Sequence, residues 1–80
     1  MFWYRTCSVC GQGRLFLFKD VTANRLYLHC EECEWGWRDP EAVSDPKRAF
    51  LSLNEEFEAV PASQEDVVAH GWEPYAGNRA

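Results

Sequence analysis

Apolar and polar residues alternate along "RLYLHC" (25–30), which is the period of a β-strand with two different faces. Leu26, Leu28 and Cys30 fall on one face of this segment. Tyr27 and His29 fall on the other face. The same kind of pattern, with many strand-forming residues, predicts further strands over residues 2–6, 14–21 and 34–39. The compact connection "TAN" after the second of these segments predicts an antiparallel hairpin.

Helical signals dominate the second half of the chain. The dipeptides Asp39-Pro40 and Asp45-Pro46 each place an N-cap residue before a proline suited to the first helical position. The second of these predicted helices carries an apolar stripe at helical spacing, made of Ala49, Phe50, Leu53 and Phe57. We therefore expect a helix that begins at Pro46 and extends through this stripe.

A last helix is predicted near the C-terminus. The stretch "SQED" (63–66) has the capping-box pattern that opens a helix, here over "EDVVAH" (65–70). Gly71 is placed to end it, and Trp72 would then fold back on Val67 in a Schellman contact. This helix therefore has a defined start and a defined end in the sequence.

Charge divides the chain unevenly. Residues 1–38 carry five basic and four acidic side chains, a net of +1, and residues 39–80 carry three basic and nine acidic ones, a net of −6. The longest apolar run, "LFLF", is far too short to cross a bilayer, and the N-terminus lacks the pattern of a signal peptide. We therefore expect a cytoplasmic protein, in which cysteines stay reduced and paired Cys-x-x-Cys motifs are typical of metal sites.

The four cysteines have the spacing C-x2-C-x19-C-x2-C and are Cys7, Cys10, Cys30 and Cys33. Tetrahedral zinc takes four thiolates at about 2.3 Å, and two short loops can deliver two each. Gly11 follows the first pair, where such a loop needs a positive φ, whereas Glu34 holds the matching place after the second pair. We expect one structural Zn²⁺; the site then adds +2 − 4 = −2 to the net charge of −5, giving −7.

With these two knuckles, Cys7–Gly11 and Cys30–Glu34, residues 2–38 resemble a zinc ribbon. The resemblance implies a small antiparallel sheet around one zinc ion with no open coordination position. Because a bare ribbon has little core of its own, residues 39–80 should form a helical acidic half packed on it. The sequence thus predicts an α+β fold in a single domain, residues 1–80: a zinc-ribbon antiparallel sheet with short C-terminal helices packed on it.

Other metal chemistries fit the cysteines less well. A rubredoxin-like electron carrier, the minor alternative, also uses four cysteines, but it holds iron and its knuckles read Cys-Pro-x-Cys-Gly rather than "CEECE". A thioredoxin-like redox pair needs a βαβ setting that the pattern lacks. His29 is an alternative ligand beside Cys30, but we favour a strand residue on the face opposite Cys30.

Binding rather than catalysis is the expected role, because the cysteines are taken by metal and no Ser/His/Asp or Cys/His set remains. We expect the acidic half to dock a basic protein through Glu55, Glu56, Glu58, Glu65 and Asp66. In its small size and acidity, the chain also resembles bacterial immunity and antitoxin proteins. This resemblance implies a partner such as a toxin nuclease. The rival hypothesis is a nucleic-acid-binding ribbon that uses Arg14, Lys19 and Arg25. The negative charge of the chain would repel a phosphate backbone.

Overall fold

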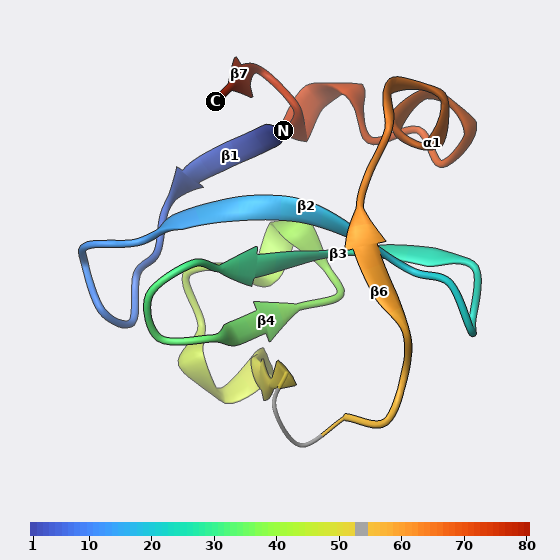
Figure 1. Ribbon diagram of the computed structural model, residues 1–80. Helices are drawn as coiled ribbons and strands as arrows, with labels where there is room; N and C mark the ends of the chain where they lie inside the picture. Colours follow the sequence, from blue (N-terminus) through green and yellow to red (C-terminus); the bar gives the residue numbers. More distant parts are fainter. Residues whose placement is uncertain (53–54) are drawn as a thin grey trace.

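Seven strands within the described residues form an antiparallel sheet at the centre of the protein (Figure 1). The computed structural model describes residues 1–52 and 55–80. Neighbouring strands follow the order β5-β4-β3-β2-β1-β7, and β6 pairs with β2 as well. The strands are β1 (Phe2–Thr6), β2 (Arg14–Asp20), β3 (Arg25–Cys30), β4 (Trp35–Trp37), β5 (Phe50–Leu51), β6 (Ala59–Pro61) and β7 (Asn78–Arg79). The helices that lie within the described residues are the α-helix α1 (Gln64–Ala69) and the 3-10 helices η1 (Pro40–Ala42), η2 (Pro46–Arg48) and η4 (Glu73–Tyr75).

The hairpin of β2 and β3 confirms the predicted alternation. Leu15 lies opposite Cys30 and Leu17 lies opposite Leu28, so these residues share one face of the sheet. All four are fully buried, together with Trp37 of β4. This inner face is the main core of the protein, and burial of such side chains is the chief stabilising contribution of a small domain.

The turn between β2 and β3 depends on a buried carboxylate. Asp20 is only 3% exposed, and its Oδ1 accepts a hydrogen bond from the backbone N–H of Ala23 at 3.0 Å. Asn24 takes a positive φ of 53°, a conformation that asparagine tolerates better than most residues. The connection is therefore an ordered turn whose one buried charge has a backbone partner and an ion-pair partner, Arg25.

Helix α1 begins and ends as the sequence predicts. Ser63 Oγ accepts from the backbone N–H of Asp66, and the Asp66 carboxylate accepts from the N–H of Ser63, which completes the capping box. Gly71 has a φ of +70°, and the N–H of Trp72 donates to the Val67 carbonyl at 2.9 Å, as in a Schellman motif. Val67 is buried in the core, so the helix contacts the inner face of the sheet.

The prediction of a helix from Pro46 through Phe57 is wrong. Both Asp-Pro starts form, but each yields a single 3-10 turn, and Ala49 is already extended at φ −82°, ψ 157°. Phe50 instead continues into β5 and lies opposite Gly36 of β4. Packing on the sheet therefore overrides the helical spacing of the apolar residues. Leu53, the middle of the predicted stripe, lies outside the described residues.

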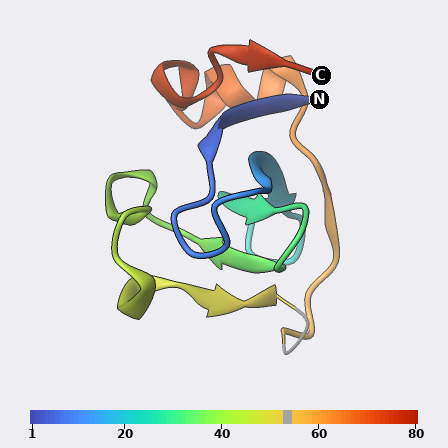
Figure 2. The ribbon, with the colours of Figure 1, turned by 90° about the vertical axis from the view of Figure 1, so that its left-hand side faces the viewer.

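No helix in the described part of the chain combines the length and the apolar character that a membrane crossing requires. The two chain ends lie side by side, because β1 and β7 pair and the backbones of Met1 and Ala80 exchange hydrogen bonds (Figure 1). In Figure 2, α1 and β7 lie at one end of the molecule and β5 lies at the other.

We predict that Gly36→Ala destabilises the protein by about 1–3 kcal/mol, because overpacking is costly. A Cβ at this position would lie 2.9 Å from the Phe50 ring and 3.1 Å from the Leu28 carbonyl oxygen. Gly77→Ala is the matched control, since a Cβ there meets nothing within 4 Å. Urea unfolding of the metal-loaded proteins measures both, and equal midpoints for the two variants would contradict the close contact of β4 with Phe50.

Candidate metal centre

The first Cys-x-x-Cys loop follows β1 and is closed by its own backbone. The N–H of Gly11 donates to the Cys7 carbonyl at 3.0 Å, and the N–H of Cys7 donates to the Gly13 carbonyl at 2.7 Å. Gly11 has a φ of +69°, which glycine adopts without steric cost. The N–H of Gly13 points at a sulfur atom and lies 3.4 Å from Cys10 Sγ. Such N–H groups stabilise negative charge on a thiolate.

The second loop follows β3 and repeats this arrangement. The N–H of Glu34 donates to the Cys30 carbonyl at 3.2 Å. The N–H groups of Glu32 and Cys33 lie 3.4 and 3.5 Å from Cys30 Sγ. Glu34 has a φ of +65°, so it takes the same left-handed conformation as Gly11 although it carries a side chain. The two knuckles therefore match in backbone shape despite the different residue after each pair.

The two loops bring all four cysteine sulfur atoms within 4.8 Å of one another. Across the loops, Cys7 Sγ lies 3.8 Å from Cys33 Sγ, and Cys10 Sγ lies 3.6 Å from Cys30 Sγ. A tetrahedral ion with metal–sulfur distances of about 2.3 Å requires sulfur atoms about 3.8 Å apart. The predicted ligands are thus gathered as unbridged cysteines, and their geometry fits one tetrahedral metal ion.

Gly13 is a further residue on which the cluster depends. A Cβ at this position would lie only 2.5 Å from Cys30 Sγ, so only glycine lets the β2 end of the loop approach that sulfur. In the sequence, this glycine indicates a loop and nothing more. The requirement comes from the close approach of two segments that are far apart along the chain, which a local pattern does not encode.

The surroundings give the thiols unequal affinities for protons. Backbone N–H groups of Gly13 and Gln12 lower the pKa of Cys10 to about 6. Burial raises the pKa of Cys33 to about 12 and also raises the pKa of Cys30. A bound cation reverses the effect of burial, because it stabilises the thiolate form directly. The cluster is therefore unfavourable as four free thiolates and suited to a metal ion.

His29 lies where the strand pattern predicts, on the face opposite Cys30. Its ring meets Phe18 edge to face at a centroid distance of 5.3 Å. Burial lowers the pKa of His29, so the neutral imidazole is favoured there. The group of potential ligands in the described residues consists of the cysteines alone.

The acidic residues predicted to bind a partner lie at two ends of the molecule. In the views of Figures 1 and 2, the segment 55–58 lies toward the bottom of the molecule, just before β6, and α1 lies toward the top. Four of them are exposed, namely Glu55, Glu56, Glu58 and Glu65. Asp66 is partly buried and serves α1 itself: it completes the capping box and accepts from Lys19 Nζ at 3.1 Å.

Each basic residue of the nucleic-acid hypothesis is paired with a carboxylate. The Arg14 guanidinium donates to both oxygens of Glu31, at 2.8 and 3.1 Å. Lys19 Nζ lies 3.1 Å from the Asp66 carboxylate on α1, and Arg25 Nε lies 3.7 Å from the Asp20 carboxylate. These pairs reduce the positive charge available to a phosphate backbone.

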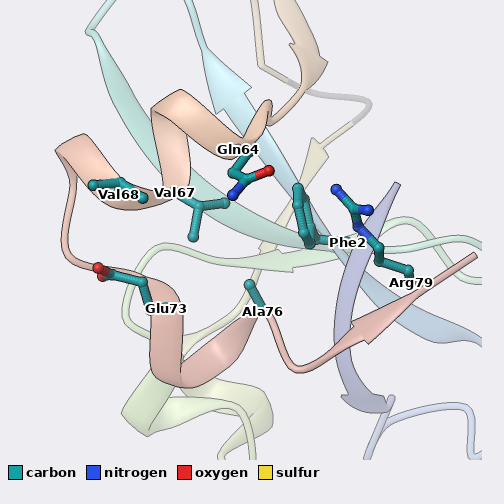
Figure 3. A pocket seen from close by; sticks show the side chains of 7 residues that line it. All are labelled: Phe2, Gln64, Val67, Val68, Glu73, Ala76 and Arg79. Carbon is teal, nitrogen blue, oxygen red and sulfur yellow. The ribbon is translucent and has the colours of Figure 1, made fainter.

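A surface pocket of about 270 Å³ lies between α1, η4 and the paired chain ends (Figure 3). The guanidinium of Arg79 lies 4.7 Å from the centroid of the Phe2 ring, and Glu73 lies on the other side of the pocket. Both charged residues are exposed, and the described residues that line the pocket include none of the cysteines. The pocket is therefore separate from the metal centre.

No family model, curated protein or solved structure matches this chain. The chain is a small β domain whose four-cysteine cluster is consistent with one bound metal ion.

We predict that Cys30→Ser loses the metal ion and unfolds. Cys30 is fully buried and ends the central strand β3, and metal binding at such sites contributes on the order of 10 kcal/mol to folding. Metal analysis by mass spectrometry and circular dichroism measure the two effects, with Ser44→Ala at an exposed turn as the control. A Cys30→Ser protein that kept one metal ion per chain and native dichroism would refute the ligand set.

Proposed function

We propose that this protein is a non-catalytic, zinc-stabilised interaction domain, built like a zinc ribbon, that binds a basic protein. Four thiolates at tetrahedral spacing are the donor set of a structural zinc site, and four protein ligands leave no position for a reacting water molecule. Iron is the other metal that such a donor set accepts, and the departure of "CEECE" from the rubredoxin knuckle favours zinc.

The proposal of a basic partner rests on how the charges are used. Of the eight basic side chains, five lie within 4.0 Å of a carboxylate and therefore have their charge compensated inside the molecule. Within the described residues, the same pairs use five of the thirteen acidic side chains, which leaves eight carboxylates and three basic groups outside them and the net charge of −5 unchanged. The field that a partner meets is therefore negative.

The same observation disfavours nucleic acid. Arg14, Lys19 and Arg25 are all among the paired residues, and a phosphate would have to displace a carboxylate from each. A cationic protein meets no such obstacle, because the carboxylates at Glu56 and Glu58 are exposed and outside the ion pairs of the described residues. An inhibitor of a basic toxin nuclease is the specific role that we propose, since inhibition by such a domain requires tight, charge-steered association.

We predict that the double change Glu56→Gln and Glu58→Gln slows association with the partner by about threefold or more at low salt, and flattens its salt dependence. Stability should change by less than about 1 kcal/mol, because exposed charges contribute little to folding. The partner is first recovered by cross-linking from the native host and identified by mass spectrometry. Its association rate is then followed against ionic strength by stopped-flow fluorescence.

The matched control removes charge of the other sign. Lys47→Gln with Arg79→Gln, both outside the ion pairs of the described residues, should leave the association rate equal or raise it. Electrophoretic mobility shifts with RNA and DNA should show no binding at low salt. A shift that Arg14→Ala and Arg25→Ala abolish would overturn the proposal in favour of nucleic acid.

A further inference from the structure

The sheet has a second, outer face that is rich in aromatic rings. Because Phe16 lies opposite His29 and Phe18 lies opposite Tyr27, these four side chains point away from the leucine core. Phe50 belongs to the same face, since it pairs with Gly36, which pairs with His29. The aromatic face defined here consists of Phe16, Phe18, Tyr27, His29, Phe50 and Phe57.

Phe57 joins the aromatic face from the acidic segment 55–58. Its ring lies 5.4 Å from the Tyr27 ring and 6.4 Å from the Phe50 ring. The exposed carboxylates of Glu56 and Glu58 flank it in the sequence. One of the two predicted acidic groups is therefore anchored to this face by an aromatic contact.

Both ends of the aromatic face already hold an arginine. At one end the Arg14 guanidinium lies 4.9 Å from the centroid of the Phe16 ring, and Glu31 binds it with two hydrogen bonds. At the other end the Arg38 guanidinium lies 4.0 Å from the centroid of the Phe50 ring, with Glu55 3.6 Å away. The same combination of a flat cation, an aromatic ring and a carboxylate thus occurs twice.

The middle of the aromatic face is open. A groove of about 490 Å³ lies over Phe16, Phe18 and His29, and its wall is formed by Arg14, Glu31 and the chain ends, Met1 and Ala80. Phe18 and His29 remain partly exposed, whereas Phe16, under its arginine, is 6% exposed. The groove therefore offers a third aromatic position that no arginine of this chain covers among the described residues.

The geometry points to this groove as the docking site for an arginine side chain on a basic segment of the partner protein. This inference rests on the proposed function, since it names the surface and the chemistry by which the basic partner is held. A guanidinium stacks on an aromatic ring more favourably than an ammonium does, because it is flat and less strongly hydrated. The negative field of the chain favours a cationic occupant over the bases of a nucleic acid.

The test uses the zinc-loaded full chain and two short synthetic peptides, one of alternating Gly and Arg, the other of alternating Gly and Lys. Fluorescence anisotropy measures their affinities. We expect the arginine peptide to bind about threefold or more tightly than the lysine peptide. Phe18→Leu should weaken the arginine peptide about three- to tenfold and remove the preference. The matched control, Phe2→Leu, replaces a partly buried aromatic ring away from the aromatic face and should change neither.

Amide chemical-shift changes in the wild type give a second readout that does not depend on the folding of a variant. Saturating arginine peptide should shift the amides of Phe18 and His29 more than those of α1. Equal binding of both peptides, unaffected by Phe18→Leu, would overturn the groove while leaving a charge-based partner in place. Failure of both peptides to bind would overturn the groove and remove the attraction on which the proposed function depends. An oligouridine RNA that shifted the Phe18 amide would also overturn the inference.

Discussion

Four cysteine sulfur atoms within 4.8 Å of one another set the main constraint on this small protein. Thiolates so close together repel strongly in a partly buried site, and a divalent cation removes that repulsion. The cation would tie the loop before β2 to the loop after β3. Cys30 belongs to the cysteine cluster, is the last residue of β3 and lies opposite Leu15 across the central hairpin. Metal centre, hairpin and core therefore depend on the same few residues.

The two faces of the sheet differ in the side chains that they carry. The inner face is filled by leucines, the buried cysteines and Trp37, and gives the fold its stability. The outer face carries aromatic rings, and two arginines held by carboxylates lie over it: Arg14 over Phe16, and Arg38 over Phe50 and Phe57. Five of the eight basic side chains form ion pairs with carboxylates of the described residues, so the groups outside these pairs are mostly acidic. The surface outside the ion pairs therefore carries an excess of negative charge.

Local rules account for much of the fold. The strand alternation, the cysteine cluster and the caps of α1 at Ser63 and Gly71 follow from spacing and residue type, and all are confirmed. The prediction of a helix after Pro46 is wrong because Phe50 pairs with Gly36 of β4. Helical periodicity depends only on local spacing and does not include such a contact. The contact at Gly13 and the pairing of the basic residues join distant segments, so the sequence pattern does not contain them.

X-ray absorption spectroscopy of the protein purified from its native host tests the metal centre most directly, because it identifies the element and its ligands together. We predict an absorption edge of zinc and four sulfur neighbours at about 2.3 Å, with no nitrogen or oxygen in the first coordination sphere. An iron edge would contradict the structural zinc site in favour of an electron carrier. A zinc edge with a nitrogen ligand would contradict the assignment of all four cysteines as ligands.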